Sequence, residues 1–228
     1  MSEVILALDV ATAESAEAML DRIPEVRWVK VGSILMTREG GGLVRRLAAR
    51  GLHVFLDLKW HDIPNTVAGA VSQARDLGAA MATVHALGGR RMLEAAARAA
   101  GDGLQLVGVT VLTSHDASGY AELAGREAVS LDDEARRLAV MARQCGLAGV
   151  VCSPAETALL RQALGPDATI VVPGIRMGTE RTDDQKRVAT PAAAARAGAT
   201  HLVVGRPVLE AADPCQAFAE ITRQVLAP

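Results

Sequence analysis

Short apolar segments recur at regular intervals along the chain, and longer amphipathic segments separate them. Most of the apolar segments are continuous rather than alternating, which is typical of strands that are buried on both faces of a parallel sheet. The pattern predicts eight strands. They are Val4–Leu8, Trp28–Val31, Val54–Leu58, Met81–Val84, Leu106–Leu112, Gly149–Cys152, Thr169–Val172 and His201–Val204.

The separating segments are rich in Ala and predict helices. Thr12, Ser130 and Ser153 stand where helix N-caps are expected, and Gly51 and Gly78 stand where helices should end. The eight predicted helices are Ala13–Arg22, Gly41–Ala49, Thr66–Leu77, Arg91–Ala99, Leu131–Gln144, Ala155–Ala163, Pro191–Ala197 and Pro214–Val225.

Eight strands in strict alternation with eight helices predict a (β/α)8 TIM barrel, which we expect to form one domain over residues 1–228. An open, doubly wound sheet is the alternative, but eight units without a break in composition favour a closed barrel. The longest polar segment covers about residues 174–191 and follows the seventh strand. A loop of that length in a compact domain predicts a lid.

Composition and charge exclude several classes of protein. A net charge of −2 and an aromatic content of 2% argue against a nucleic-acid-binding surface. No apolar segment approaches the roughly 18 residues that a membrane helix needs, and the N-terminal segment lacks the basic start of a signal peptide. We therefore expect a cytoplasmic protein with no membrane partner.

The cysteines and histidines give no sign of a metal or a disulfide. Cys145, Cys152 and Cys215 lie far apart and form no CxxC pair, and Cys152 is interpreted as a small core residue. The histidines lack metal-binding spacing. We interpret His85 as a hydrogen-bonded structural residue and His61 as a loop residue, without assigning a role to either.

The strand ends carry the candidate chemistry, because active sites of such barrels lie at the carboxyl ends of the strands. Asp57 and Lys59 end the third strand and are two residues apart, so both should point to one side. Lys30 lies on the second strand near its end, and Asp62 lies in the loop after the third strand. The two carboxylates should favour the protonated form of Lys59.

Lysine is scarce in this chain, which has 21 Arg but only Lys30, Lys59 and Lys186. An isolated Asp-x-Lys is usually a surface ion pair of little energetic value. However, Lys can give up a proton and Arg cannot, so the few lysines are candidates for positions where Arg would fail. Together with the strand-end position, this favours an active site. Lys186 has no assigned role.

A phosphate site is predicted after the eighth strand. Gly205 and Arg206 follow that strand, where many barrels bind phosphate, and an Arg side chain can donate two hydrogen bonds to one anion. Arg176 and Gln185 on the long loop could close over the anion. Neither a P-loop nor a dinucleotide fingerprint is present.

Six motifs occur in order across nearly the whole chain: "LALDV", "VKVG", "FLDLKWHDIPNT", "VTVLTS", "PGIR" and "VVGRP". In this set the chain resembles the bacterial orotidine 5′-monophosphate decarboxylase family. The resemblance implies decarboxylation of orotidine 5′-monophosphate (OMP) to UMP and CO2, the last step of UMP synthesis. It also implies that no cofactor or metal is used.

The resemblance implies a role for each matching residue. Asp9 and Lys30 would contact the ribose, Asp57 would face the substrate carboxylate, Lys59 would donate the proton to C6, and Thr113 would bind the pyrimidine. The implied phosphate ligands are Arg176, Gln185, Gly205 and Arg206.

The resemblance further implies an obligate homodimer. In it, Asp62, Ile63 and Thr66 would reach into the active site of the neighbouring subunit.

Two other functions remain open at this point. A metal-dependent barrel that acts on a sugar phosphate would share Asp57, Lys59 and Asp62, but it should have an acidic metal ligand near the second strand, where this chain has Lys30. A barrel that binds a nucleotide without catalysis would have no need of Lys59.

Overall fold

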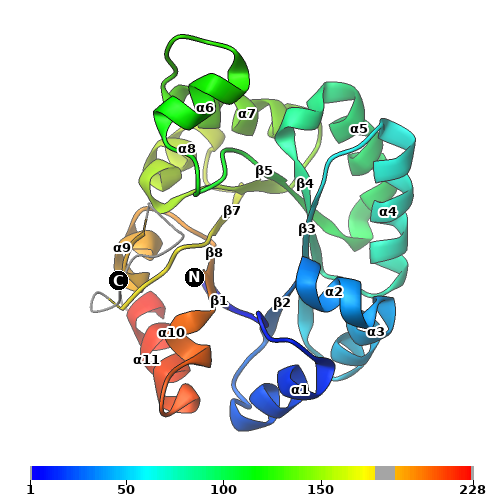
Figure 1. The fold of residues 1–228 in the computed structure, drawn as a ribbon, viewed down its shortest axis with the longest axis vertical. Coiled ribbons are helices and arrows are strands. Elements are labelled where there is room, and N and C mark those ends of the chain that lie inside the picture. The colour runs from blue at the N-terminus through cyan, green and yellow to red at the C-terminus, as the bar shows by residue number, and fades with distance from the viewer. Residues whose placement is uncertain (1, 178–187, 227–228) are drawn as a thin grey trace.

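Eight parallel strands close into a barrel in sequence order, and helices surround it (Figure 1). The computed structural model describes residues 2–177 and 188–226. The predicted (β/α)8 barrel is therefore confirmed. Its strands are β1 Glu3–Ala7, β2 Trp28–Gly32, β3 His53–Trp60, β4 Met81–His85, β5 Gln105–Val109, β6 Gly149–Val151, β7 Thr169–Val172 and β8 His201–Val204.

All eight predicted helices are present. The α-helices are α1 Ala13–Arg22, α2 Ser33–Glu39, α3 Gly41–Ala49, α4 Pro64–Asp76, α5 Gly89–Ala100, α6 Ala117–Ala124, α7 Leu131–Gln144, α8 Thr157–Leu164, α9 Pro191–Arg196, α10 Arg206–Leu209 and α11 Pro214–Leu226. Three of them, α2, α6 and α10, were not predicted. Short 3-10 turns η1 Ala86–Gly88, η2 Gly101–Gly103 and η3 Pro154–Glu156 precede or follow strands.

The structure confirms the sequence signals that predicted the helix ends. The Thr12 and Ser130 side chains accept hydrogen bonds from the first turns of α1 and α7. Ser153 forms a capping box at η3, immediately before α8. Gly51 and Gly78 follow α3 and α4 with φ angles of 81° and 87°, a backbone region that favours glycine.

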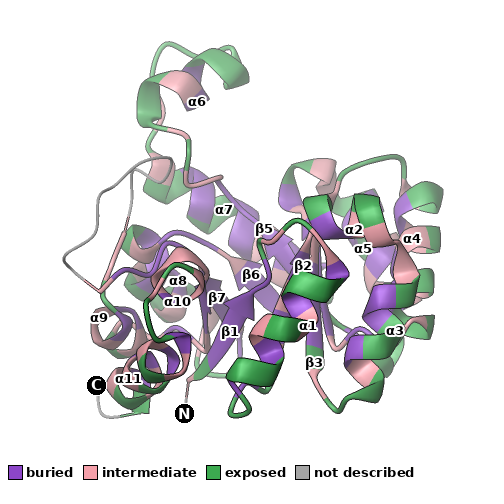
Figure 2. Ribbon diagram, turned by 60° about the horizontal axis from the view of Figure 1, so that its bottom comes forward, coloured by how far each residue is buried: buried purple, intermediate pink, exposed green. Residues whose placement is uncertain are grey.

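The fifth predicted strand is wrong at its end, because β5 stops at Val109 rather than at Leu112. Thr110 and Val111 remain buried, so the apolar pattern continues although the strand does not. Val111 instead packs against Tyr120 of α6. Figure 2 shows α6 projecting beyond the barrel above α7.

Alternate residues of each strand face two different apolar layers. The inward side chains include Ile5, Phe55, Met81 and Val107, which form the barrel interior. Their neighbours, such as Leu56, pack outward against the helices. Figure 2 shows buried residues along the strands and on the inner faces of the helices. The hydrophobic layers thus hold the strand ends in fixed positions around the mouth.

The predicted lid lies mostly outside the described residues. Its two ends meet where Ile175 pairs with Ala189 in a single parallel bridge. Residues 178–187 are not described, so the lid remains a prediction. Among the described residues, we find no helix with the length and apolar character needed to cross a membrane.

An aromatic cluster closes the amino-terminal end of the barrel. The Trp28 ring lies 4.8 Å from the His53 ring and 5.0 Å from the His201 ring, between centroids. His201 Nδ1 is 2.9 Å from the Thr200 hydroxyl. Burial lowers the pKa of His201 to about 4, so its imidazole is neutral in the folded protein at neutral pH.

We expect the neutral, largely buried His201 to make the folded protein less stable in mild acid than at neutral pH. Its pKa is lower in the folded chain than in the unfolded chain, so the unfolded chain binds more protons between about pH 6.5 and pH 4. The stabilisation is complete above this window and is lost as the pH falls through it. From pH 7 to pH 5 the loss from this group should reach about 2 kcal/mol.

Urea unfolding of the His201→Gln variant at both pH values would measure this effect. The difference in unfolding free energy between pH 7 and pH 5 should be smaller than in the wild type. His53→Gln removes an exposed imidazole from the same aromatic cluster and is the matched control. An equal pH dependence in the wild type and His201→Gln would contradict the prediction.

Candidate active site

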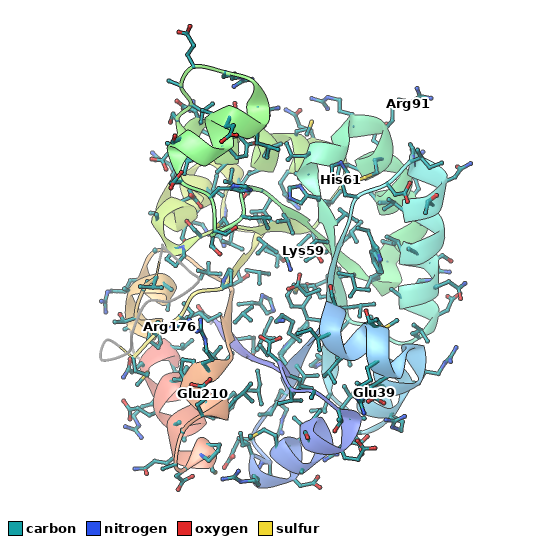
Figure 3. All side chains as sticks on the ribbon, in the orientation of Figure 1. Glu39, Lys59, His61, Arg91, Arg176 and Glu210 are labelled. Carbon is teal, nitrogen blue, oxygen red and sulfur yellow. The ribbon has the colours of Figure 1, made fainter. Side chains whose placement is uncertain are left out.

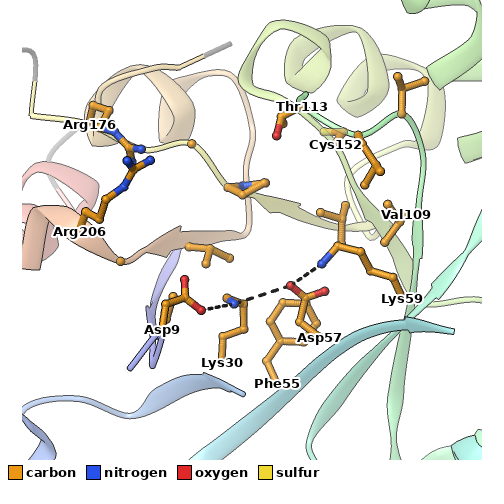
Figure 4. A pocket seen from close by; sticks show the side chains of 18 residues that line it. Asp9, Lys30, Phe55, Asp57, Lys59, Val109, Thr113, Cys152, Arg176 and Arg206 are labelled. Atoms are coloured by element: carbon orange, nitrogen blue, oxygen red, sulfur yellow. Dashed lines mark hydrogen bonds and ion pairs between the residues drawn. The ribbon is translucent and has the colours of Figure 1, made fainter. Parts of the chain in front are cut away.

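The carboxyl ends of the strands surround a cavity of about 300 Å³ at the mouth of the barrel (Figure 4). Eight of the twelve predicted site residues line it. They are Asp9, Lys30, Asp57, Lys59, Thr113, Arg176, Gly205 and Arg206. The structure thus brings together residues from the ends of six strands and from the segments that follow them.

Four charged groups of alternating sign form one continuous row in this cavity. Lys30 Nζ lies 2.9 Å from Asp9 Oδ1 and 3.9 Å from Asp57 Oδ2. Lys59 Nζ lies 2.9 Å from the same Asp57 oxygen. The side chains of Lys30 and Asp57 are only 12% and 13% exposed. In such a partly desolvated place, each charge interacts with its neighbours more strongly than it would in water.

The backbone at Lys59 is unusual. Its φ angle of 51° is the only positive φ of a non-glycine residue within residues 2–177 and 188–226. The pairing of β3 with β4 is also irregular between Leu56 and Trp60. Asp57 and Lys59 face the same side, as expected, but regular strand alternation is not the whole reason. A left-handed residue in an irregular strand is strained, and such strain is concentrated at functional sites.

Thr83 of β4 holds this irregular segment and was missed by sequence reasoning. Its hydroxyl accepts a hydrogen bond of 2.8 Å from the Lys59 backbone N–H and donates one of 3.1 Å to Asp57 Oδ1. Thr83 is completely buried. In the sequence "MATVH" it resembles an ordinary β-branched strand residue, so no local signal reveals its contacts.

Two arginines lie at the other end of the cavity. Figure 4 shows Arg176, which follows β7, and Arg206, at the start of α10, beside each other and far from Lys59. Figure 3 shows the same separation of Lys59 and Arg176 across the mouth. Arg176 is only 8% exposed. A pair of guanidinium groups in this position can bind a dianion such as phosphate. Gln185 and Lys186 lie outside the described residues.

Apolar side chains complete the wall of the cavity, and sequence reasoning did not select them. They include Phe55, Val109, Val151 and Val203, which face the barrel interior. Cys152 also lines the cavity and is 1% exposed, so its interpretation as a core residue is confirmed. The alternation of side chains along each strand was the sequence signal that could have identified the apolar wall residues. Within the charged row, Lys30 and Asp57 are largely shielded from water, whereas the side chains of Asp9 and Lys59 are 54% and 40% exposed.

Thr113 is carried by the segment that leads from β5 to α6. This segment is anchored by Tyr120, which is buried against Ala86, Val111 and Leu138. Burial, the largest cause, raises the pKa of the Tyr120 hydroxyl. Thr113 therefore reaches the cavity from an anchored segment rather than from a strand.

Asp62, Ile63 and Thr66 do not line the cavity of their own chain. All three are exposed on the loop after β3 and the first turn of α4, and Ile63 is 67% exposed. The Asp62 carboxylate accepts a 2.6 Å hydrogen bond from the Ile63 backbone N–H. These residues are accessible to a second molecule.

His61 and His85 stack beside the cavity, with ring centroids 5.6 Å apart. His85 Nδ1 accepts a 3.3 Å hydrogen bond from the Leu87 backbone N–H, in agreement with the interpretation as a hydrogen-bonded residue. Burial above all, and then the charges of His61 and Lys59, lower the pKa of His85 to about 4. His85 therefore adds no positive charge beside Lys59 at neutral pH.

No cluster of three or more His, Cys, Asp or Glu side chains that could hold a metal ion occurs in the described part of the chain. The residues near the cavity instead alternate acid and lysine. Lys30 stands at the end of β2, where a metal-dependent site of this type would need an acidic ligand.

The fold and the cavity define a class of protein. A (β/α)8 barrel with a row of acids and lysines at one end of its mouth and two arginines at the other is suited to an enzyme that acts on an anionic, phosphate-bearing molecule.

Comparison with known proteins defines the family. Residues 2–221 match the family described as "Orotidine 5'-phosphate decarboxylase / HUMPS family", and the chain belongs to it. The predicted family and the expectation that the chain is a decarboxylase-type enzyme are therefore confirmed.

Individual relatives are similar over nearly their full length. A protein of Halorhodospira halophila named orotidine 5′-phosphate decarboxylase is 53% identical, with 98% of this chain and 96% of that protein covered. A protein of Chromobacterium violaceum with the same name is 49% identical, with 98% and 92% covered. The crystal structure of the Lactobacillus acidophilus decarboxylase gives a TM-score of 0.88 at 34% identity, with 99% of both chains covered.

Proposed function

We propose that this protein converts OMP into UMP and CO2 without a metal ion or an organic cofactor. The row Asp9, Lys30, Asp57 and Lys59 carries the proposal, because it sets the Lys59 ammonium group at a cavity of about 300 Å³, 2.9 Å from the Asp57 carboxylate. The names of the relatives support the substrate.

The chemistry requires electrostatic stabilisation. Breaking the bond between C6 and the carboxylate leaves the electron pair in an sp² orbital on C6, where the pyrimidine ring offers no conjugated electron sink. A nearby cation stabilises this developing charge. Lys59 is the residue we assign to this task. Its Nζ then donates a proton to C6, and solvent restores the proton on the amine.

Asp57 has two tasks in this proposal. Its carboxylate holds Lys59 at 2.9 Å, which directs the ammonium group into the cavity. It would also lie close to the substrate carboxylate, and departure of neutral CO2 removes one of the two facing negative charges. Lys30 lies between Asp57 and Asp9 and pairs with both carboxylates. It would also contact the ribose.

The phosphate would lie at the other end of the cavity, at Arg176, Arg206 and Gly205. Thr113 would hydrogen bond the pyrimidine near the opposite end. Gln185 and the lid, about residues 174–191, would close over the phosphate, so that remote binding free energy supports the chemical step. The separation of Arg176 and Arg206 from Lys59 in Figure 4 supports this orientation of the nucleotide.

We also propose that the protein acts as a cytoplasmic homodimer with shared active sites. Exposed apolar side chains support this proposal. Ile34 is 70% exposed, Ile63 is 67% exposed and Leu87 is 40% exposed. All three belong to segments that follow β2, β3 and β4, on the side of the mouth that carries Lys59. In the dimer, Asp62, Ile63 and Thr66 would enter the partner's site.

Turnover of OMP after removal of metal would test the proposed function. The purified protein is treated with a chelator, OMP is added, and the ultraviolet absorbance is followed as OMP becomes UMP. We expect full turnover after chelation. Turnover that appears only when Mg²⁺ is returned would indicate a metal-dependent sugar-phosphate type of chemistry, and no turnover under either condition would reject the decarboxylase.

A further inference from the structure

Thr83 occupies an unusual place inside the barrel. It is on β4, two residues after Met81, whose side chain belongs to the barrel interior. The strand neighbour of Thr83 on β5 is Val107, which is also interior. Thr83 is 0% exposed and is not among the residues that line the cavity. Thr83 therefore lies in the barrel interior, in the layer of buried side chains beneath the charged row.

Its hydroxyl closes a ring of hydrogen bonds. The Lys59 backbone N–H donates to Thr83 Oγ1 at 2.8 Å, and the Thr83 hydroxyl donates to Asp57 Oδ1 at 3.1 Å. The other oxygen of Asp57 accepts from Lys59 Nζ at 2.9 Å. One hydroxyl thus connects the backbone of Lys59 to the carboxylate that holds the side chain of Lys59.

The irregular pairing of β3 explains why a hydroxyl is present at this position. Leu56 is opposite Ala82 and Trp60 is opposite Val84, so residues 57–59 of β3 correspond to Thr83 alone on β4. The Lys59 N–H therefore bonds to a side chain instead of to a backbone carbonyl of β4. A buried backbone N–H without a partner would be costly, and Thr83 supplies that partner.

We propose that Thr83 is a positioning residue that sets the orientation of Asp57 and Lys59 for decarboxylation. This inference rests on the proposed function. The hydroxyl fixes the rotation of the Asp57 carboxylate, so that its second oxygen faces both lysines. It also fixes the left-handed backbone of Lys59 and therefore the direction in which the ammonium group enters the cavity.

A purely structural role for Thr83 would need only its shape. Val107 beside it fills the same interior with a β-branched apolar side chain, and Val has nearly the same shape as Thr. Thr83→Val therefore keeps the volume of the side chain and removes only the hydroxyl. Thr83→Ser does the reverse, because it removes the methyl group and keeps the hydroxyl. The two variants separate positioning from packing.

The experiment measures kcat and KM for OMP, and the dissociation constant for UMP, in both variants. We expect Thr83→Val to lower kcat by about 10- to 100-fold, the range for loss of a hydrogen bond to a charged group. The KM for OMP and the dissociation constant for UMP should change by less than about threefold, because Thr83 does not line the cavity. Thr83→Ser should keep most of kcat.

Thr110→Val is the matched control. Thr110 is also completely buried, and its hydroxyl donates a 3.0 Å hydrogen bond to the Val151 carbonyl rather than to a charged group. It should lower kcat far less than Thr83→Val does. If Thr83→Val does not fold, Thr83→Cys replaces it, since a thiol has similar size and is a weak hydrogen-bonding group.

Two results would overturn the inference. One is a kcat for the Thr83 variant without a hydroxyl that lies within threefold of the wild type. The other is an equal loss in Thr83→Ser, which would assign the effect to packing. The wild-type assay separates this inference from the proposed function, because wild-type protein that does not decarboxylate OMP rejects the function before any Thr83 variant is compared.

Discussion

Replacing Lys59 with Ala should reduce the decarboxylation rate by at least about 10⁴-fold, because it removes both an electrostatic stabiliser and a general acid, each of which contributes about 10²-fold or more. The Lys59 ammonium group lies 2.9 Å from Asp57 and projects into the cavity, so no other cation can take its place without moving. Stopped-flow and long-time absorbance assays with OMP would measure kcat over this range.

Lys59→Arg is the control for charge. It keeps the positive charge near Asp57, but guanidinium is a very weak acid, so decarboxylation should stay strongly impaired. The binding of UMP should persist in Lys59→Ala if the cavity remains intact. A rate for Lys59→Ala within tenfold of the wild type would contradict the assigned role. It would favour a barrel in which Lys59 is only one partner of a salt bridge.

A heterodimer of one Asp62→Ala chain and one Lys59→Ala chain should recover about half of the wild-type activity, although each variant alone is nearly inactive. The reason is that Asp62 is exposed and absent from its own cavity, so we propose that it completes the partner's site. In the heterodimer, one site receives both intact residues and the other receives neither. Co-expression with two affinity tags and sequential purification would isolate this species.

Two further measurements make the result decisive. The tagged homodimers of each variant give the background activity. A heterodimer of Lys59→Ala with the wild type gives the activity of a tagged dimer that has one intact site. A heterodimer of Asp62→Ala with Lys59→Ala that is no more active than the two homodimers would reject shared sites. A monomer in solution at assay concentrations would reject them too.

The barrel was predictable because its strands and helices each carry a strong repeating signal. The elements that the sequence did not reveal lie at the mouth. Helix α2 follows strand β2 directly, with Gly32 as its N-cap and no side-chain cap. The helix α10 has only four residues. The helix α6 begins after a segment in which buried Val111 extends the apolar run of β5.

Most residues of the candidate site could be predicted from the sequence, but their geometry could not. Charges at strand ends stand out in sequence because they interrupt buried segments, and Asp57, Lys59 and Arg206 were found in this way. Thr83 could not be found in this way, because a hydroxyl in a β-branched residue is common in strands. The positive φ of Lys59 also leaves no sequence signal, since that conformation is usually marked by Gly or Asn.

Because the backbone of Lys59 is left-handed, stability and activity favour different residues at this position. A residue with a β-carbon is strained there, at a cost of about 1–3 kcal/mol, and glycine would not be. Laboratory evolution for heat resistance alone would therefore favour Lys59→Gly wherever relief of this strain exceeds the loss of the 2.9 Å ion pair with Asp57, and that change removes the chemistry. Any programme to make this enzyme more durable has to select for turnover and stability together, or exclude position 59 from the library.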